Sequence, residues 1–391
     1  MMDIEKIQGY LKEHELDGWL MADFHARNDV AVEMLHLKGV LTRRSFYFIP
    51  VEGSPVGLIP EIEKSKFGHL PGELKPFAGY RAMEQELTRV LEGRKWVAME
   101  YSRMGRLPYI GLVDAGTVEM VRSMGVEIVS SADLVAAFQA RLTEPQIAAH
   151  HEAAGKLMEI KDGAFSLIAR SLTEGKPVSE YDVSQHILEQ FNKNNMVCEF
   201  NPICAVDGNA GNPHYQPTAE KSVTIQKGHL ILIDLWAKLK TEDGIYGDIT
   251  WMAYAGTRDE IPEKYVSMFD VIVRARDAAI SFIEDSMQER PIYGSEVDDA
   301  CRAVVAEAGY GDYFTHRTGH SIGTHGHGSG PNIDNLETED RRILQPGHLF
   351  SIEPGIYMDD CGFRTEIDCL ITDGGCQVTT LPKQTGILAL L

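Results

Sequence analysis

The segment that decides the fold is HLILIDLWAKLK at residues 229–240, followed by Asp243-Gly244 and by IYGDITWMAYAG at 245–256. Both apolar runs are typical of strands, and the Asp-Gly pair between them is typical of a turn. The pattern therefore predicts a hairpin of two antiparallel strands. Asp234 interrupts the first strand and Asp248 lies on the second, so two carboxylates are expected inside an apolar sheet.

Helix-start signals precede this hairpin. In the run Thr143-Glu144-Pro145-Gln146, the threonine can cap a helix, with proline in its first turn and glutamine at the capping-box position. These residues predict a long helix that ends near Leu172. Ser179 with Asp182 predicts a second helix that ends near residue 194.

The same order of elements recurs after the hairpin. A helix is expected over about 261–286, and Ser295 with Asp298 is expected to cap another helix that ends at Gly309. A second β-rich stretch should run from about 314 to the end. Helix, helix and sheet therefore occur twice, which suggests an internal duplication of structure with a cleft between two facing sheets.

The first 140 residues have a different character, because short helical and strand-like runs alternate there. This alternation predicts an α/β domain. The region has no phosphate-binding loop and no dense cluster of histidines and acids, so we expect a supporting role. The expected helices lie at 3–15 and 113–125, and the expected strands at 16–23, 43–50, 55–60, 95–101 and 126–131.

Bulk composition limits the partners. The chain has 391 residues and a formal net charge of −21, which argues against nucleic acid and anionic membranes as partners. No apolar run is long enough for a transmembrane helix, and the N-terminal residues lack the pattern of a signal peptide. The six cysteines form no CxxC pair, so we expect free thiols and a cytoplasmic location.

Five residues carry the chemistry, and each lies in or beside an apolar, strand-like segment. A carboxylate inside a sheet is costly unless it is paired or bound to a cation. Four carboxylates and one imidazole suit Mn²⁺ best, with Co²⁺, Fe²⁺ or Zn²⁺ as alternatives, and four negative charges suit two divalent ions. Two such ions define a hydrolytic site. The five residues are Asp234, Asp248, His320, Glu353 and Glu366.

The histidine lies in FTHRTGHSIGTHGHGSG at residues 314–330. His316 and His320 are four residues apart, a spacing that would form a metal-binding face on a helix. The five glycines in this run, at 319, 323, 326, 328 and 330, disfavour a helix, so strand and loop are predicted instead. Glycine would also allow the backbone to approach a ligand closely.

These motifs together resemble the creatinase/aminopeptidase P/prolidase family (M24) of metallopeptidases, and most of all its Xaa-Pro dipeptidases. The resemblance implies an α+β fold: a pita-bread catalytic domain over 141–391 with pseudo-twofold helix-helix-sheet halves, preceded by a creatinase-like α/β domain over 1–140. The motifs that carry the resemblance are IDLWAK, GDIT, HRTGHSIG, SIEPGIY and FRTEID.

The resemblance also implies a role for each metal ligand. Asp234 would hold one ion, His320 with Glu353 would hold the other, and Asp248 with Glu366 would bridge them. Their chain positions match the motifs throughout, although Asp234 and Asp248 are more widely separated than is usual in that family.

Further roles follow from the same resemblance. Glu353 would act as general base, and His214 would assist proton transfer and bind substrate. His316 and His327 would face the substrate, with His327 stabilising the tetrahedral intermediate. The remaining two residues, Tyr357 and Arg364, would orient ligands and carboxylates.

The expected activity is hydrolysis of the peptide bond before proline in dipeptides or short peptides, by a homodimer. Phe200 and Trp251 stand where the family usually has tyrosine and arginine. These two changes leave open a same-fold enzyme that acts on a non-peptide small molecule, such as an ectoine-derivative hydrolase or a lyase. A binding module without catalysis is disfavoured, because such domains typically lose ligands and this chain has all five.

Overall fold

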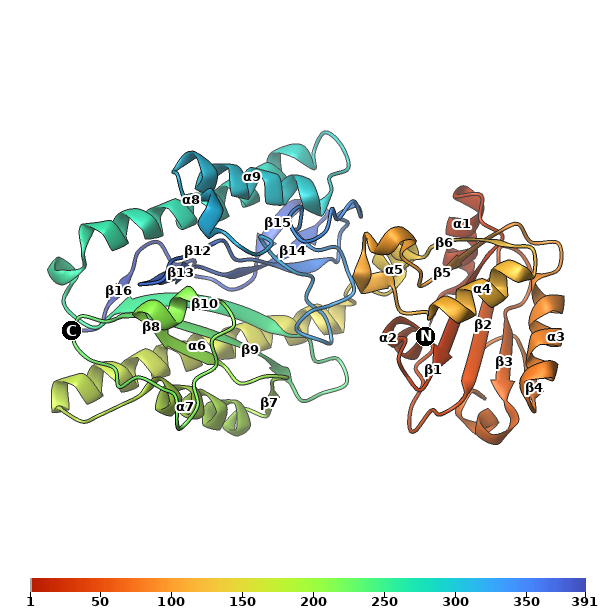
Figure 1. The fold of residues 1–391 in the computed structure, drawn as a ribbon, viewed down its shortest axis with the longest axis horizontal. Coiled ribbons are helices and arrows are strands. Elements are labelled where there is room, and N and C mark those ends of the chain that lie inside the picture. The colour runs from red at the N-terminus through yellow and green to blue at the C-terminus, as the bar shows by residue number, and fades with distance from the viewer. Residues whose placement is uncertain (1) are drawn as a thin grey trace. The chain divides into compact units, whose positions relative to one another are not determined.

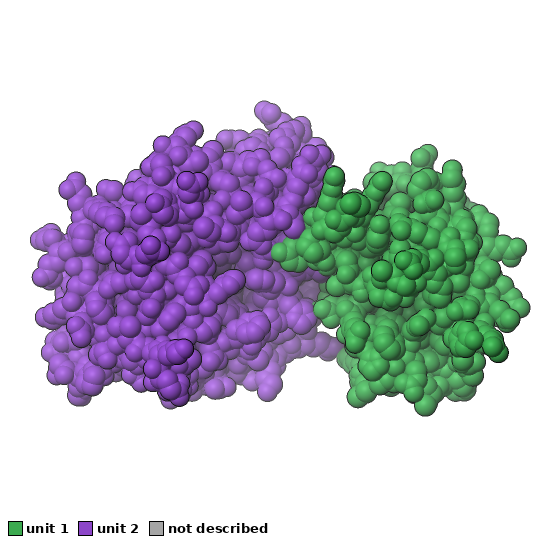
Figure 2. All heavy atoms as spheres, viewed as in Figure 1, with its two compact units in different colours: residues 1–139 green, residues 140–391 purple. Residues whose placement is uncertain are grey.

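The computed structural model describes residues 2–391. The chain forms two compact units, which Figure 2 distinguishes by colour. Unit 1 ends at Gln139, and unit 2 spans Ala140–Leu391. Within the described residues, we find no helix that is both long and apolar enough to cross a membrane.

Unit 1 is built on a six-stranded mixed sheet with the order β4-β3-β2-β1-β5-β6. Strand β1 pairs antiparallel with β2 and parallel with β5. Its side chains alternate between two apolar clusters: Trp19 and Met21 pack on one face, and Leu20 on the other. Because both faces are covered, the central strands are almost continuously apolar, as the sequence shows.

The elements of unit 1 agree with the predicted alternation, but the sequence did not predict the helices α2, α3 and α5 or the strand β4. The strands are β1 Gly18–Phe24, β2 Arg44–Pro50, β3 Val56–Pro60, β4 Glu73–Phe77, β5 Trp96–Met99 and β6 Glu127–Ser130, and the helices are α1 Ile4–Glu13, α2 Asp29–Met34, α3 Tyr80–Leu91, α4 Ala115–Ser123 and α5 Ala132–Phe138.

Unit 2 begins with α6 (Glu144–Glu174) and α7 (Glu180–Lys193). The Thr143 amide donates to Gln146 Oε1 at 2.9 Å, which is half of the predicted capping box. The predicted Ser179–Asp182 box also forms, because each backbone amide donates to the other side chain. Gly175 ends α6 in the left-handed conformation, with φ 68°.

The predicted hairpin is strands β9 (Leu230–Leu239) and β10 (Gly247–Tyr254), which pair antiparallel. Alternation gives this sheet two different faces. Ile231, Ile233 and Leu235 pack in one cluster with residues of α6 and α7, whereas Leu230 and Leu232 belong to the cluster of the second half. The remaining strands of this sheet are β7 Met196–Val197, β8 Ile203–Val206 and β16 Leu388–Ala389.

The second half repeats the order of helices and sheet. Figure 1 shows α6 and α7 on one side of unit 2 and α8 and α9 on the other, with the strands between them. The fold class is thereby confirmed. The elements are α8 Glu263–Ser286, α9 Gly294–Glu307, β11 Leu349–Ile352, β12 Gly355–Tyr357, β13 Gly362–Arg364, β14 Ile367–Thr372 and β15 Gly375–Val378.

The predicted cap of α9 is wrong. The helix starts one residue earlier than Ser295, and its N-cap is Tyr293, whose backbone amide donates to Glu296 Oε2 at 3.0 Å. Asp298 instead points away from the helix end: its Oδ1 accepts the backbone amide of Thr318 at 2.9 Å. The carboxylate of Asp298 therefore serves a distant loop rather than the start of its own helix.

Gly155, inside α6, and Gly175, its C-cap, allow a test of the left-handed conformation at the end of this helix. Added methyl groups at Gly155 and Gly175 would meet no atom within 4 Å, so only backbone conformation distinguishes the positions. Gly175→Ala should lower the free energy of unfolding by about 1 kcal/mol, because alanine disfavours a positive φ. Gly155→Ala, in the helix interior, should raise it by about 0.5–1 kcal/mol. Urea midpoints measure both, and equal shifts of one sign would contradict the left-handed cap.

Candidate metal centre

The hairpin β9–β10 supplies two of the predicted ligands. The cross-strand pairs are Thr250 with Asp234 and Asp248 with Trp236. Directly paired residues of antiparallel strands project from the same face, so both carboxylates point away from the α6–α7 layer. Each is almost completely buried, with Asp234 exposed by 7% and Asp248 by 6%.

The second half of unit 2 supplies the other three predicted ligands. Glu353 follows β11 directly, and Glu366 lies between β13 and β14. The loop that carries His320 runs beside β11, where the Ser351 amide donates to the His320 carbonyl at 2.9 Å. The backbone amide of Glu353 donates to the Thr318 carbonyl at 2.7 Å, which fixes the glutamate relative to the histidine.

These side chains converge. Ligand atoms of Asp248, His320 and Glu366 all lie within 4.8 Å of one another. His320 Nε2 is 3.6 Å from Asp248 Oδ2 and 3.5 Å from Glu353 Oε1. Thr250, which is paired with Asp234, donates its hydroxyl to Glu366 Oε2 at 2.7 Å. The structure therefore brings residues that are more than a hundred positions apart into one carboxylate-rich centre.

The donor set fits divalent cations. Among the described residues, the buried oxygens Asp234 Oδ1 and Asp248 Oδ1 have no hydrogen-bond partner. Buried carboxylate oxygens without partners are costly, and a cation would satisfy them. Oxygen ligands with a single imidazole and no thiolate are the set that Mn²⁺ and related ions prefer.

Burial and mutual repulsion change the acidity of this centre. Loss of solvent raises the pKa values of Asp234, Asp248 and Glu366, and the negative neighbours raise those of Asp248 and Glu366 further. Burial likewise raises the pKa of Glu353 to about 7, although Arg364 opposes the change. Without cations, burial and mutual repulsion therefore favour the protonated forms of these carboxyl groups.

Arg364 is the cation that the chain itself provides. Its guanidinium forms an ion pair with Asp234, and its Nε donates to the Thr250 hydroxyl at 3.0 Å. A third nitrogen donates to the Tyr357 hydroxyl at 3.1 Å. Arg364 thus contacts Asp234, Thr250 and Tyr357, and the role of Arg364 and Tyr357 in orienting the metal ligands stays a prediction.

His316 is held by protein groups on both sides of its ring. Its Nε2 is 2.6 Å from the Tyr357 hydroxyl, and its Nδ1 is 2.6 Å from the Arg317 carbonyl. A substrate contact of His316 stays a prediction, and both ring nitrogens already have partners in this structure.

His327 and His214 lie on the solvent-facing side of the centre, and both side chains are exposed. The His327 ring packs on that of His320, with centroids 4.1 Å apart, and Arg317 approaches its Nδ1 to 3.4 Å. His214 is near enough to influence the acidity of Asp234. Both histidines are therefore positioned beside the predicted ligands rather than among them.

Two residues of the centre were missed by the sequence reading. Thr250 connects Arg364 with Glu366, and Asp368 accepts the backbone amide of Asp248 at 2.9 Å. Thr250 and Asp368 lie on strands β10 and β14, each two positions after a predicted ligand. Because side chains two positions apart on a strand share a face, this spacing was a usable signal in the sequence.

The two unusual aromatic residues occupy different surroundings. Trp251 lies on the opposite face of β10 from Asp248, where Lys161 Nζ is 3.6 Å from the centre of its ring. Trp251 therefore does not face the metal centre, because strand alternation turns it toward α6. Phe200 is 69% exposed.

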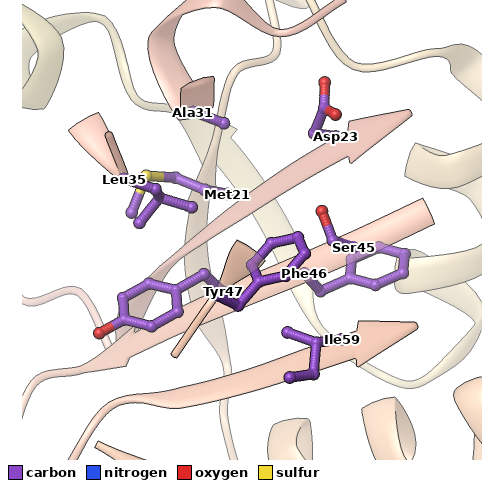
Figure 3. Close-up of a pocket in the computed structure, with 9 residues that line it drawn as sticks. Met21, Asp23, Ala31, Leu35, Ser45, Phe46, Tyr47 and Ile59 are labelled. Carbon is purple, nitrogen blue, oxygen red and sulfur yellow. The ribbon is translucent and has the colours of Figure 1, made fainter. Parts of the chain in front are cut away.

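A separate hollow in unit 1 does not compete as a functional site. Figure 3 shows its lining, in which Met21, Tyr47 and Ile59 come from neighbouring strands β1, β2 and β3. The hollow has no room for a water molecule, and its walls are mainly core side chains. We therefore interpret it as a packing defect.

The chain belongs to metallopeptidase family M24, whose model matches residues 149–373. The predicted family is thus confirmed, and with it the prediction of a metallopeptidase. The match lies within unit 2 and includes all five predicted ligands.

The chain is also similar to individual dipeptidases in sequence and in structure. A Xaa-Pro dipeptidase of Lactobacillus delbrueckii subsp. lactis is 34% identical over 60% of this chain, and the chain spans 59% of that enzyme. A Xaa-Pro dipeptidase of Pyrococcus horikoshii is 25% identical over 96% of each chain. Among solved structures, the dipeptidase PepE of Mycobacterium ulcerans matches with a TM-score of 0.76 and 20% identity, covering 99% of this chain and 96% of that one, which shows a shared fold.

The raised pKa values predict proton-linked metal binding. A carboxyl group must lose its proton to bind a cation, so affinity for Mn²⁺ should fall as the pH drops below about 7, the pKa of Glu353. Calorimetric titration of chelator-treated protein at pH 6, in two buffers of different protonation enthalpy, should reveal proton release. The release should be smaller at pH 8.5. Binding enthalpies that do not depend on the buffer at pH 6 would contradict the protonated centre.

Proposed function

We propose that this protein is a metal-dependent dipeptidase that uses two divalent ions to cleave the bond before proline. The observation that carries the proposal is the convergence of Asp248, His320 and Glu366, with unpartnered buried oxygens on Asp234 and Asp248. Relatives named Xaa-Pro dipeptidases support the choice of substrate.

The charge of the centre supports two ions rather than one. Asp234, Asp248, Glu353 and Glu366 would together carry four negative charges, and Arg364 offsets one of them. We assign Asp234 to one ion, His320 with Glu353 to the other, and Asp248 with Glu366 to both. Mn²⁺ is our first choice of metal, with Co²⁺, Fe²⁺ or Zn²⁺ as alternatives.

The bound ions would supply Lewis acidity, which polarises the scissile carbonyl and makes water more acidic. Glu353 has an oxygen on the His320 side of the centre, 3.5 Å from His320 Nε2, and is our candidate for the general base that accepts the proton of the attacking water. A hydrogen bond from the Ser351 hydroxyl, at 3.1 Å, holds that oxygen in place.

His327 and His214 then act on the substrate from the solvent side. Arginine can only donate, so the contact with Arg317 favours the His327 tautomer whose Nε2 carries the proton. That N–H can donate to the oxygen that gains charge in the tetrahedral intermediate. His214 is our candidate for proton transfer to the leaving nitrogen.

The domain roles and the assembly are part of the same proposal. We assign residues 1–140 to a creatinase-like domain and 141–391 to the pita-bread catalytic domain, in a homodimer without nucleic-acid or membrane partners. The six cysteines form no disulfide within the described chain, which supports a reducing, cytoplasmic location.

An assay of metal-stripped protein tests the proposal. Mn²⁺ or Co²⁺ is restored, and Xaa-Pro dipeptides are compared with longer Xaa-Pro peptides and with dipeptides that lack proline. Metal-dependent cleavage of Xaa-Pro dipeptides alone is the expected result, and cleavage of longer peptides would indicate an aminopeptidase. Two bound ions without peptide cleavage would reject the dipeptidase and direct the search to small-molecule amides and lyase substrates.

Two variants separate metal binding from the later steps. Asp248→Asn should lower metal content and reduce kcat by at least about a hundredfold, because a bridging carboxylate is lost. His327→Ala should keep the metal content of the wild type and lower kcat by roughly 10²–10³-fold, the usual effect of removing one oxyanion donor. Elemental analysis and steady-state kinetics measure both effects. Full activity of the Asp248 variant would disprove the bridging assignment.

A further inference from the structure

Trp236 is the nearest cross-strand neighbour of a predicted metal ligand. It follows Asp234 by two positions on β9 and pairs directly with Asp248 on β10. Residues in such a pair project from the same face with their Cβ atoms about 4.5–5.5 Å apart. An indole therefore lies beside the carboxylate centre, on the face that carries the chemistry.

The indole of Trp236 is not fully buried. Leu230 and Leu232, which precede it on the same face of β9, are exposed by no more than 2%, whereas Trp236 is half-buried. Its side chain packs against the small cluster that includes Tyr246 and Ile322 and against the core of the second half, and part of it stays accessible. Part of an apolar ring is thus available to a ligand of the centre.

One edge of the ring lies close to the histidine-rich loop. A methyl group placed on Gly326 would lie 3.7 Å from Trp236 Cδ1 and 3.7 Å from Glu199 Oε2, so the loop passes near the indole. The next residue is His327, the proposed oxyanion donor. Trp236 therefore occupies the rim between Asp248 and His327.

The loop is fixed in this position by groups of the same hairpin. Lys238 Nζ donates to the Thr324 carbonyl at 2.5 Å, and the Tyr246 amide donates to the Gly323 carbonyl at 3.1 Å. A substrate held at the centre would meet a pre-formed apolar wall, and little side-chain entropy would be lost on binding.

We propose that Trp236 is a specificity-determining residue whose indole packs against an apolar ring or side chain of the substrate next to the scissile bond. Aromatic faces pack well on aliphatic rings, whereas the predicted ligands near Trp236 are carboxylates and an imidazole. The inference rests on the proposed peptidase function and selects apolar substrates, with the pyrrolidine ring of proline as a member of that class.

Trp251 provides a matched control. It lies on the adjacent strand β10, but its side chain points to the opposite face, where Lys161 covers it. Trp251→Phe therefore makes the same chemical change in the same sheet without touching the metal side.

The first test compares Ala-Pro with Ala-Gly as substrates of the Mn²⁺-loaded enzyme. Trp236→Ala should lower kcat/KM for Ala-Pro relative to Ala-Gly by about tenfold or more, mainly through KM, with unchanged metal content. Trp236→Phe should show a smaller loss, and Trp251→Phe should match the wild type. An equal loss for both substrates, or a loss of metal, would overturn the proposal and make Trp236 a structural support of Asp248.

The second test does not depend on turnover. Titration of the Mn²⁺-loaded protein with L-proline should change the intrinsic tryptophan fluorescence saturably, and the response should disappear in Trp236→Phe but persist in Trp251→Phe. A wild type without a response, or a response that survives in Trp236→Phe, would overturn the proposal. If no peptide is cleaved but this pattern appears, the proposed reaction fails and the assignment of Trp236 stands.

Discussion

The repulsion among buried carboxylates is the constraint on which the rest of unit 2 depends. Asp234, Asp248 and Glu366 are exposed by no more than 7%, and ligand oxygens of Asp248 and Glu366 lie within 4.8 Å of each other. Such a group is unfavourable without counter-charge, because each charge loses its hydration and repels the others. Arg364 offsets part of this cost, and the unpartnered oxygens indicate that cations offset more.

A centre of this kind requires a rigid framework, and the two similar halves of unit 2 both contribute to it. Each half places two helices against a sheet, and the apolar clusters on both sides are continuous and fully buried. Backbone hydrogen bonds then fix the ligands: the Asp248 amide is bound by Asp368, and the Glu353 amide is bound by the Thr318 carbonyl. The free energy of core packing therefore holds together charges that would otherwise separate.

The two faces of the β9–β10 sheet have different roles: one packs in the core, and the other carries the predicted metal ligands. On β9, odd-numbered residues pack against the helices, while Asp234 and Trp236 face the centre. On β10, Trp251 joins the helix side, and Asp248 and Thr250 face the centre. One face is thus reserved for the core and the other for recognition and catalysis, because side chains alternate along a strand.

Much of this arrangement could be predicted from the sequence. The capping boxes at Thr143 and Ser179 and the hairpin around Asp243-Gly244 depend on local interactions, which are encoded within a few residues. The four candidate carboxylate ligands were recognisable because a carboxylate in or beside an apolar strand is conspicuous.

Only the tertiary structure showed that Asp298 serves a distant loop, that both nitrogens of His316 are occupied and that Trp236, rather than Trp251, borders the centre. These properties depend on partners far away in the chain. Local sequence determines which elements form, whereas the packing of those elements determines what each side chain faces.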